Sequence, residues 1–252
     1  MELRRAFDRI PEQFDRWRPR YCGALFRALI EDAGIGPDSD VLELGPGTGQ
    51  ATTPLLDTGC RYLGIELGEH LAAFMRRKYG DRDNFRLVND DFITHDFGAA
   101  RFDLVYSAMT IQWIPEDIAF PKCLKLLKPG GTLAMLLTRS EYRTPNEALY
   151  RRIQAVYAAH FKPEIPYRQV FHYDRAEEYG FEGFLTREFP GRRVFDAGQY
   201  VAFCQTHCDH MDIPEPDRTA FFTGLREAVE AFGNRIVFND TYVLMTARKP
   251  AR

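Results

Sequence analysis

The chain has 252 residues, of which 45% are hydrophobic and 27% charged, a length and composition that suit one globular domain. Its formal net charge of −3 provides no global basic field, so we expect no nucleic-acid partner. We find no apolar run long enough to span a bilayer and no signal-peptide pattern, so we expect no membrane partner. The five cysteines form no C-x-x-C pair, which predicts reduced thiols in a cytoplasmic protein.

Residues 1–39 are predicted to form helices. Helical spacing relates the apolar residues Phe7, Ile10, Phe14 and Trp17, and a second apolar face covers residues 25–30. The intervening segment 18–21 has two interpretations. It either connects two helices that pack on the domain, or it bends over a ligand site formed by the next part of the chain.

Residues 41–52 are the most informative stretch. A short buried strand, 41–44, is followed by Gly45, Gly47 and Gly49 and then by a helical pattern from Gln50. Such a strand, glycine turn and helix lets a ligand approach the backbone and the helix N-terminus. The spacing differs from the dinucleotide fingerprint because the third glycine comes one residue early, and no Gly-Lys-Ser/Thr follows for a phosphate loop.

Alternating strands and helices follow as far as residue 138. The predicted strands are 62–65, 85–88, 102–107 and 132–137, the predicted helices are 69–79 and 118–127, and 128–131 is a predicted turn. This alternation predicts a parallel, doubly wound sheet. Glu66 ends the second strand, where a carboxylate is placed to accept hydrogen bonds from a ribose diol.

After residue 138 the pattern changes. Residues 140–185 are rich in aromatics, and the region beyond predicts a strand at 186–194, helices at 196–208 and 217–232, and a last strand at 241–247. Asp196 is a predicted helix N-cap. The aromatic residues are either the core of an insertion or the lining of a pocket for an apolar or aromatic ligand.

Together these motifs resemble class I S-adenosylmethionine (SAM)-dependent methyltransferases. The matching segments, in the order and spacing of that family, are residues 43–49, 64–66, 91–92, 102–107 and 126–131. Residues 18–21, 108–113 and 241–250 resemble the small-molecule branch, which includes trans-aconitate-type methyltransferases.

The resemblance implies a single α/β domain over residues 1–252. Its fold is Rossmann-like, with a doubly wound, seven-stranded and mostly parallel sheet whose last strand is antiparallel. The expected parts are an N-terminal helical cap (1–39), a cofactor-binding core (40–140), an inserted helical lid with the substrate region (141–240) and the last strand (241–252).

The implied cofactor is S-adenosyl-L-methionine. The residues expected to bind it are Tyr21, Glu43, Gly45, Gly47, Gly49, Gln50, Glu66, Leu67, Asp91, Phe92, Ser107 and Ala108. Glu43 and the glycines surround the methionine end, Glu66 accepts from the ribose, and Asp91 with Phe92 contacts the adenine. Asp90 is the alternative to Asp91, and a plain Asx turn is the alternative to an adenine contact.

Gln112, Trp113 and His207 are the predicted catalytic residues. Gln112 and Trp113 would border the methyl-transfer site, where this branch often has His in place of Gln112. Glutamine cannot accept a proton, so catalysis then rests on proximity and desolvation, with His207 as a reserve base. Helical spacing brings His207 close to Cys204 and Cys208, but this spacing matches no usual zinc set, so we predict no metal.

The predicted function is methyl transfer to an oxygen or nitrogen of a small molecule. The fourth strand ends in Ser107-Ala108-Met109-Thr110, without the Asn/Asp-Pro-Pro-aromatic motif of the methyltransferases that act on nucleic-acid amino groups. Two alternatives stay open: a protein or peptide methyltransferase, and a non-catalytic SAM-binding module. The identity of the acceptor and the oligomeric state are left open.

Overall fold

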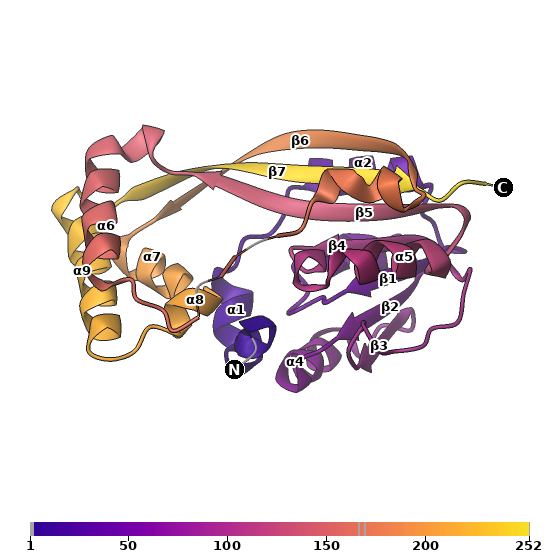
Figure 1. The fold of residues 1–252 in the computed structure, drawn as a ribbon, viewed down its shortest axis with the longest axis horizontal. Coiled ribbons are helices and arrows are strands. Elements are labelled where there is room, and N and C mark those ends of the chain that lie inside the picture. The colour runs from indigo at the N-terminus through magenta and orange to yellow at the C-terminus, as the bar shows by residue number, and fades with distance from the viewer. Residues whose placement is uncertain (1–2, 166, 169, 252) are drawn as a thin grey trace. The chain divides into compact units, whose positions relative to one another are not determined.

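The computed structural model describes residues 3–165, 167–168 and 170–251, and it divides into two compact units. Unit 1 comprises Met1–Arg18, Arg139–Arg168 and Pro190–Thr241, and unit 2 comprises Pro19–Thr138, Gln169–Phe189 and Tyr242–Arg252 (Figure 1). The predicted N-terminal cap is therefore shared between the two units. Three of the later boundaries, at 138/139, 189/190 and 241/242, fall inside long strands.

One seven-stranded sheet has the order β3-β2-β1-β4-β5-β7-β6. Its strands are β1 Asp40–Leu44, β2 Arg61–Glu66, β3 Phe85–Asn89, β4 Phe102–Ala108, β5 Leu127–Glu141, β6 Glu182–Phe195 and β7 Ile236–Arg248. The pairs β1–β2, β1–β4, β2–β3 and β4–β5 are parallel. Gly130 N–H donates to Lys249 O (3.0 Å) and Lys249 N–H to Gly131 O (2.9 Å), so β7 runs antiparallel to β5. The predicted seven-stranded sheet with an antiparallel last strand is confirmed.

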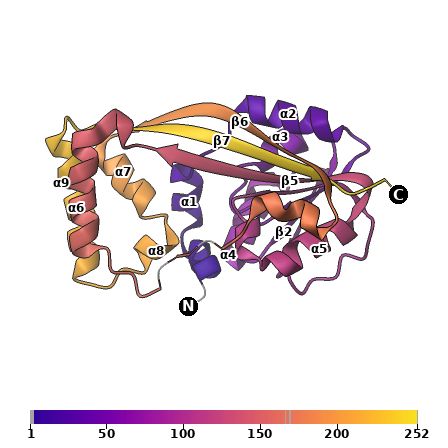
Figure 2. The ribbon, with the colours of Figure 1, turned by 45° about the horizontal axis from the view of Figure 1, so that its top comes forward.

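Helices cover both faces of the sheet in unit 2. Figure 2 shows α2 (Gly23–Ala33) and α3 (Thr52–Leu56) on one face and α5 (Glu116–Leu126) on the other. Helix α4 (Glu69–Tyr79) packs with α2 and α3, whereas the short 3₁₀ helix η4 (Tyr173–Tyr179) packs with α5. The strands between them are buried on both faces, which explains their nearly continuous apolar sequences.

Unit 1 has its own aromatic core. Its helical elements are η1 Leu3–Arg9, α1 Pro11–Trp17, η3 Thr144–Asn146, α6 Glu147–His160, α7 Ala197–Cys204, α8 Cys208–Met211 and α9 Asp217–Ala231. Helices α6 and α9 lie side by side (Figures 1 and 2), with Gly224 against Val156 so closely that a Cβ at Gly224 would lie 2.9 Å from Val156 Cγ1. Many of the aromatic residues predicted after residue 138, among them Tyr157 and Phe161, pack in or against this core.

A buried ion pair ties three strands together within unit 1. The guanidinium of Arg193 on β6 donates to both carboxylate oxygens of Asp240 on β7 and to Ser140 Oγ on β5. The same guanidinium lies 4.9 Å from the ring centre of Phe203 and 5.3 Å from that of Phe238. Because the charge is both paired and enclosed by aromatic rings, the strands can extend well beyond the apolar segments that the sequence marked.

Two predicted elements are corrected by the structure. The expected turn at 128–131 lies within β5, because Gly130 with φ 79° and its neighbour Gly131 bond to Lys249, the residue after β7. The expected helix 196–208 is two helices: α7 begins after the N-cap Asp196 as predicted but ends at Cys204. After Cys204 the helical pattern ends in two i→i+3 turns, in which Thr206 N–H donates to Phe203 O (3.0 Å) and His207 N–H to Cys204 O (3.1 Å), and His207 is extended (ψ 134°).

Asp196→Ala should destabilise unit 1. Asp196 accepts from Gln199 N–H (2.8 Å), and the Gln199 side chain accepts from Asp196 N–H, so the substitution removes a complete capping box. We expect a loss of about 1 kcal/mol in the free energy of unfolding, measured by chemical denaturation. Asp196→Asn is the matched control, because Asn caps as well as Asp. Equal losses in both variants would contradict a capping role.

Candidate functional site

The glycine loop between β1 and α3 has a backbone that only glycine adopts without strain. Gly45, Gly47 and Gly49 have φ values of 58°, 61° and 88°. A Cβ at Gly45 would lie 2.4 Å from Thr110 Cγ2, and one at Gly49 would lie 2.6 Å from the Tyr79 hydroxyl oxygen. The loop is thus held between side chains from β4's end and from α4, and it cannot accept other residues at these positions.

Glu66 lies next to this loop, at the carboxyl end of β2. Its side chain is 5% exposed, and its Oε2 and Oε1 accept from the N–H groups of Gly47 and Gly68, each at 2.9 Å. These two backbone donors fix the orientation of the carboxylate. Asn89, which the sequence did not single out, donates to Glu66 O (2.9 Å) and holds the turn from β2.

The segment after β3 is held by its own hydrogen bonds. Asp91 Oδ1 accepts from Ile93 N–H (2.9 Å), an Asx turn, while Asp90 Oδ2 lies 2.8 Å from His95 Nδ1. Phe92 is buried in the core of unit 2, so its backbone and not its ring is placed to contact a ligand. Both the Asx turn and an adenine contact therefore remain compatible with Asp91.

Lys122 on α5 holds the same segment, although no sequence pattern indicates this. Its Nζ donates to His95 O (2.6 Å) and Ile93 O (3.1 Å) and lies 5.0 Å from the ring centre of Phe92. Burial lowers the pKa of Lys122. A helix thereby fixes the backbone of a loop that carries two predicted ligand-binding residues.

Glu43 is beneath the loop. It is 1% exposed, and its Oε2 accepts from the hydroxyls of Thr52, Tyr62 and Tyr106, each at 2.6 Å. Burial raises the pKa of Glu43, and the three hydroxyl donors oppose this shift. These bonds tie Glu43 to α3, β2 and β4, and its contact with a ligand stays a prediction.

The end of β4 contains a strained residue. Met109, the residue after β4, has φ 56°, a left-handed conformation that non-glycine residues rarely adopt, and it is 42% exposed. Gln112 Nε2 donates to Met109 O (3.0 Å), which leaves Gln112 Oε1 buried and without a hydrogen-bond partner among the described residues. Ser107 Oγ accepts from Ile111 N–H (2.8 Å) and starts the turn that includes Trp113.

The remaining predicted cofactor residues also lie in unit 2. Tyr21 OH is 3.5 Å from Leu136 O, and its ring packs against Phe26 and Tyr242. Gln50 Nε2 donates to Thr48 Oγ1 (2.6 Å) within the glycine loop. Leu67 and Ala108 are half-buried at the ends of β2 and β4.

The predicted catalytic residue His207 belongs to unit 1, whereas Gln112 and Trp113 belong to unit 2. His207 Nδ1 is 3.1 Å from Cys204 O, and burial together with the positive charge of Arg18 lowers the pKa of His207 well below its usual value. The imidazole is therefore neutral. Cys204 and the other four cysteines are free thiols, and the described part of the chain has no cluster of three or more His, Cys, Asp or Glu placed to hold a metal ion.

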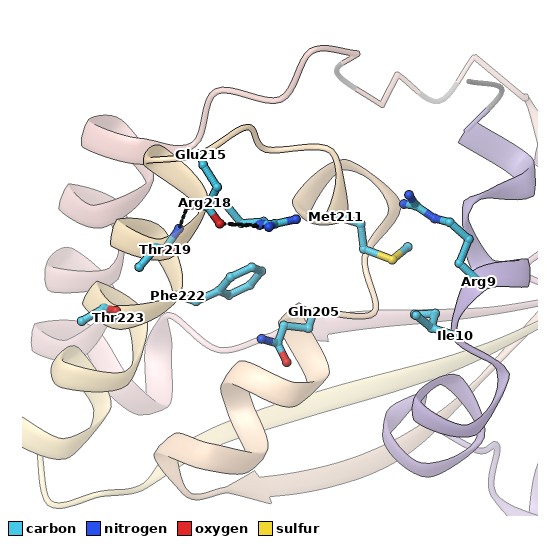
Figure 3. A pocket seen from close by; sticks show the side chains of 9 residues that line it. All are labelled: Arg9, Ile10, Gln205, Met211, Glu215, Arg218, Thr219, Phe222 and Thr223. Carbon is cyan, nitrogen blue, oxygen red and sulfur yellow. Dashed lines mark hydrogen bonds and ion pairs between the residues drawn. The ribbon is translucent and has the colours of Figure 1, made fainter.

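Unit 1 also has an open groove of about 630 Å³ between η1 and helices α7 to α9 (Figure 3). The residues that line it are Arg9, Ile10, Gln205, Met211, Glu215, Arg218, Thr219, Phe222 and Thr223. Arg218 is paired with Glu215, at 2.9 Å. None of the predicted site residues lines this groove. Within the described residues, no helix is long and apolar enough to cross a membrane.

Gly49→Ala should destabilise unit 2 more than Gly98→Ala. Both glycines have positive φ (88° and 79°), but a Cβ at Gly98 meets no atom within 4 Å, whereas one at Gly49 collides with Tyr79. We expect Gly98→Ala to lower the free energy of unfolding by about 1 kcal/mol because of the left-handed backbone. Gly49→Ala should lower it by about 1–3 kcal/mol more because of the collision. Chemical denaturation measures both, and equal losses would contradict the tight contact.

Comparisons with known proteins agree on the fold. Residues 42–135 match the family model described as "Methyltransferase domain". The mitochondrial ribosomal RNA small subunit methyltransferase of Arabidopsis thaliana is 30% identical over 123 residues, which are 47% of this chain and 30% of that protein. The chain thus spans about a third of the length of the curated relatives that it matches.

Two solved structures extend the likeness beyond the matched segment. Phosphoethanolamine N-methyltransferase 2 of Haemonchus contortus, in complex with S-adenosyl-L-methionine, has a TM-score of 0.57 at 14% identity over 96% of this chain and 57% of that one. The cyclase SpnF has a TM-score of 0.53 at 19% identity over 91% of this chain and 82% of that one. At such identities the likeness concerns the fold alone. The chain therefore has the Rossmann-like fold of class I SAM-dependent methyltransferases, and its residues 42–135 match the methyltransferase domain family.

Proposed function

We propose that the protein binds S-adenosyl-L-methionine in unit 2 and transfers its methyl group to an oxygen or nitrogen of a small molecule. One observation carries this proposal. The Glu66 carboxylate is held by the N–H groups of Gly47 and Gly68 beside three left-handed glycines, at the carboxyl ends of β1 and β2. This edge of the sheet, where the strand order reverses between β1 and β4, is where doubly wound folds bind nucleotides.

The residues present fit the cofactor chemically. Glu66 would accept from the ribose hydroxyls, the loop of Gly45, Gly47 and Gly49 would pack against the methionine end, and Asp91 would accept from the adenine amino group. Tyr21, Gln50, Leu67, Phe92, Ser107 and Ala108 would complete the site, and Glu43 would support it. The bound cofactor would supply a methyl group on a positively charged sulfur.

Catalysis in this proposal needs orientation more than proton transfer. Gln112 and Trp113 follow the strained Met109 at the end of β4, so their positions are set by a constrained backbone. The amide of Gln112 has no useful proton affinity, and a carboxylate or unprotonated amine needs no base when it is held in line with the methyl group. His207, the reserve base predicted from the sequence, lies in unit 1 and is hydrogen-bonded through Nδ1, and its role as a base stays a prediction.

The acceptor is proposed to be a small molecule, as in the trans-aconitate-type enzymes that the sequence resembles. The curated relatives favour a second candidate, ribosomal RNA. Against it stand the net charge of −3 and the segment Ser107-Ala108-Met109-Thr110, which lacks the motif that holds a base amino group.

The same cofactor site would also suit a protein or peptide acceptor, or a SAM-binding module without catalysis. The cyclase SpnF has a similar fold without being named a methyltransferase, so the fold alone does not decide between these functions. We propose a cytoplasmic location.

S-adenosylhomocysteine (SAH), the expected product, should bind to the wild-type protein in a calorimetric titration. Glu66→Ala should weaken this binding by at least about tenfold, because a buried charge-assisted hydrogen bond contributes about 1.5–3 kcal/mol. Glu69→Ala, an exposed carboxylate three residues later, is the matched control and should bind as the wild type does. Absence of binding to the wild type would overturn the proposal.

A methyl-release assay should identify the acceptor class. The substrates to compare are carboxylates, phenols, amines, peptides and the ribosomal RNA of the small subunit, each with and without the protein. Turnover with a small molecule alone supports the proposed function, and turnover with RNA supports the second candidate. SAH binding without turnover on any acceptor would favour the non-catalytic module.

Gln112→Ala should lower the turnover number and leave SAH affinity within about twofold of wild type, because Gln112 faces the acceptor side in this proposal. Steady-state kinetics and calorimetry measure the two effects. Asn146→Ala in unit 1 removes a side chain bonded to Tyr142 O and Val237 O, and it serves as the comparison for an effect that is structural only. A parallel loss of SAH affinity in Gln112→Ala would assign Gln112 to the cofactor instead.

A further inference from the structure

Unit 1 contains a groove that the proposed function does not use. It has a volume of about 630 Å³, and its lining residues belong to unit 1 (Figure 3). Sites for small molecules typically enclose about 300–1,000 Å³ and combine apolar walls with a few polar groups. The size of this groove therefore suits a small molecule, and its lining determines the class of molecule that it can hold.

The groove has apolar surface from three places in the chain. Ile10 lies just before α1, Met211 ends α8 and Phe222 is on α9, and all three line the groove. Each of them is only half-buried, so part of its surface stays accessible to a ligand. Figure 3 shows the ring of Phe222 extending from α9 into the groove. These side chains can cover the apolar body of a ligand and remove it from water.

Arg9 supplies the groove with a cation that has no partner. It is the last residue of η1 and is exposed. Among the described residues, its guanidinium makes no hydrogen bond or ion pair. In Figure 3 the guanidinium groups of Arg9 and Arg218 extend toward each other, one from η1 and the other from α9. The N–H donors of Arg9 are therefore available to a ligand in the groove.

Arg218, the second cation, uses only part of its guanidinium. Its Nε donates to Glu215 Oε1 (3.0 Å) and its Nη2 lies 2.9 Å from the same oxygen, whereas its Nη1 has no hydrogen-bond partner among the described residues. Glu215 Oε2 accepts from Thr219 N–H (3.1 Å). Hydrogen bonds from Thr219 and Arg218 lower the pKa of Glu215, so it is a carboxylate near pH 7. Two guanidinium groups thus accompany one carboxylate, which leaves the lining of the groove with a surplus of one positive charge.

We propose that the groove binds a small-molecule anion with an apolar body. The guanidinium groups of Arg9 and Arg218 donate to the anionic group, and the half-buried apolar side chains pack against the rest of the molecule. A carboxylate and a phosphate monoester both suit this site, because arginine binds either group through paired N–H donors. The inference is separate from the proposed function, because no residue of the proposed cofactor site lines the groove.

Calorimetric titrations with octanoate, octyl phosphate, octanol and octylamine test the class of ligand. The four compounds have the same chain and differ in charge. We expect the two anions to bind at least about fivefold more tightly than octanol, since each exposed ion pair contributes modestly, and octylamine to bind least. The affinity for octanoate should fall as the salt concentration rises, because salt screens exposed charges. Equal affinities for octanoate and octanol, or no binding of either anion, would overturn the inference.

Arg9→Gln is the decisive variant. It removes a cation that makes no hydrogen bond or ion pair with the described residues, so the fold should be retained. We expect it to weaken octanoate binding by about fivefold and to leave octanol binding unchanged. Arg226→Gln is the matched control, because Arg226 is an exposed arginine on α9 that does not line the groove. Unchanged octanoate affinity in Arg9→Gln, or an equal loss in Arg226→Gln, would contradict the proposal.

Nuclear magnetic resonance of methionine methyl groups tests the location of the ligand. The signal of Met211, assigned with the variant Met211→Leu, should shift when octanoate binds. The signal of Met75, which is buried in unit 2, should stay in place. Octanoate binding without a shift of Met211 would place the ligand elsewhere and overturn the inference. S-adenosylhomocysteine is absent from all these experiments, so a failure of the proposed cofactor site would not affect their outcome.

Discussion

The steric fit between the glycine loop and its two neighbouring side chains is the constraint on which the site depends. Tyr79 and Thr110 approach Gly49 and Gly45 so closely that no side chain fits at either glycine. Tyr79 and Thr110 also bond to the loop, since Tyr79 OH lies 3.3 Å from Gly49 O and Thr110 Oγ1 donates to Gly45 O (3.0 Å). The loop is thus clamped from α4 on one side and from the end of β4 on the other. The N–H group of Gly47 orients Glu66, and the rest of the proposed cofactor site is arranged around that carboxylate.

The two units are stabilised by different kinds of packing. In unit 2, strands that are apolar on both faces are covered by helices, so burial dominates. In unit 1, aromatic rings surround a small number of charges, as in the pair of Arg193 and Asp240. Asp240 is fully buried, so removing either partner would leave an unpaired charge. Strands β5, β6 and β7 contribute residues to both units and share these two kinds of packing along their length.

The fold could be predicted from the sequence wherever local signals agree with tertiary packing. The predicted helix 69–79 has the bounds of α4, because its apolar face and the glycine after it mark both limits. The glycine spacing likewise predicts the loop whose left-handed backbone the structure shows. The length of β5 could not be predicted, because Gly130 and Gly131 are turn residues by local preference and become strand residues only through pairing with β7. The break before Cys208 lies at the extended backbone of His207, which the apolar spacing does not indicate.

The sequence predicted which residues belong to the site better than it predicted the groups to which those residues bond. Glu43 and Glu66 are both acidic residues on strands next to the loop, and the sequence suggests ligand contact for each. In the structure the two carboxylates have different partners. Glu66 is held by backbone N–H groups. Glu43 accepts from the hydroxyls of Thr52, Tyr62 and Tyr106, which lie 9, 19 and 63 positions further along the chain. Such distant partners leave no local pattern. The strain at Met109 could not be predicted from the sequence either, because a methionine does not indicate a positive φ.

The contacts of Lys122 have a consequence for how this protein can change. Lys122 holds the segment after β3 through the carbonyl oxygens of Ile93 and His95, and every amino acid supplies such an oxygen. The shape of this segment is therefore encoded in α5 as well as in its own Asx turn at Asp91. A substitution at residue 93 or 95 retains both bonds from Lys122, whereas loss of the amino group at 122 removes them and leaves only the segment's own hydrogen bonds. The segment can diversify its surface chemistry over evolutionary time while the geometry next to Asp91 is retained.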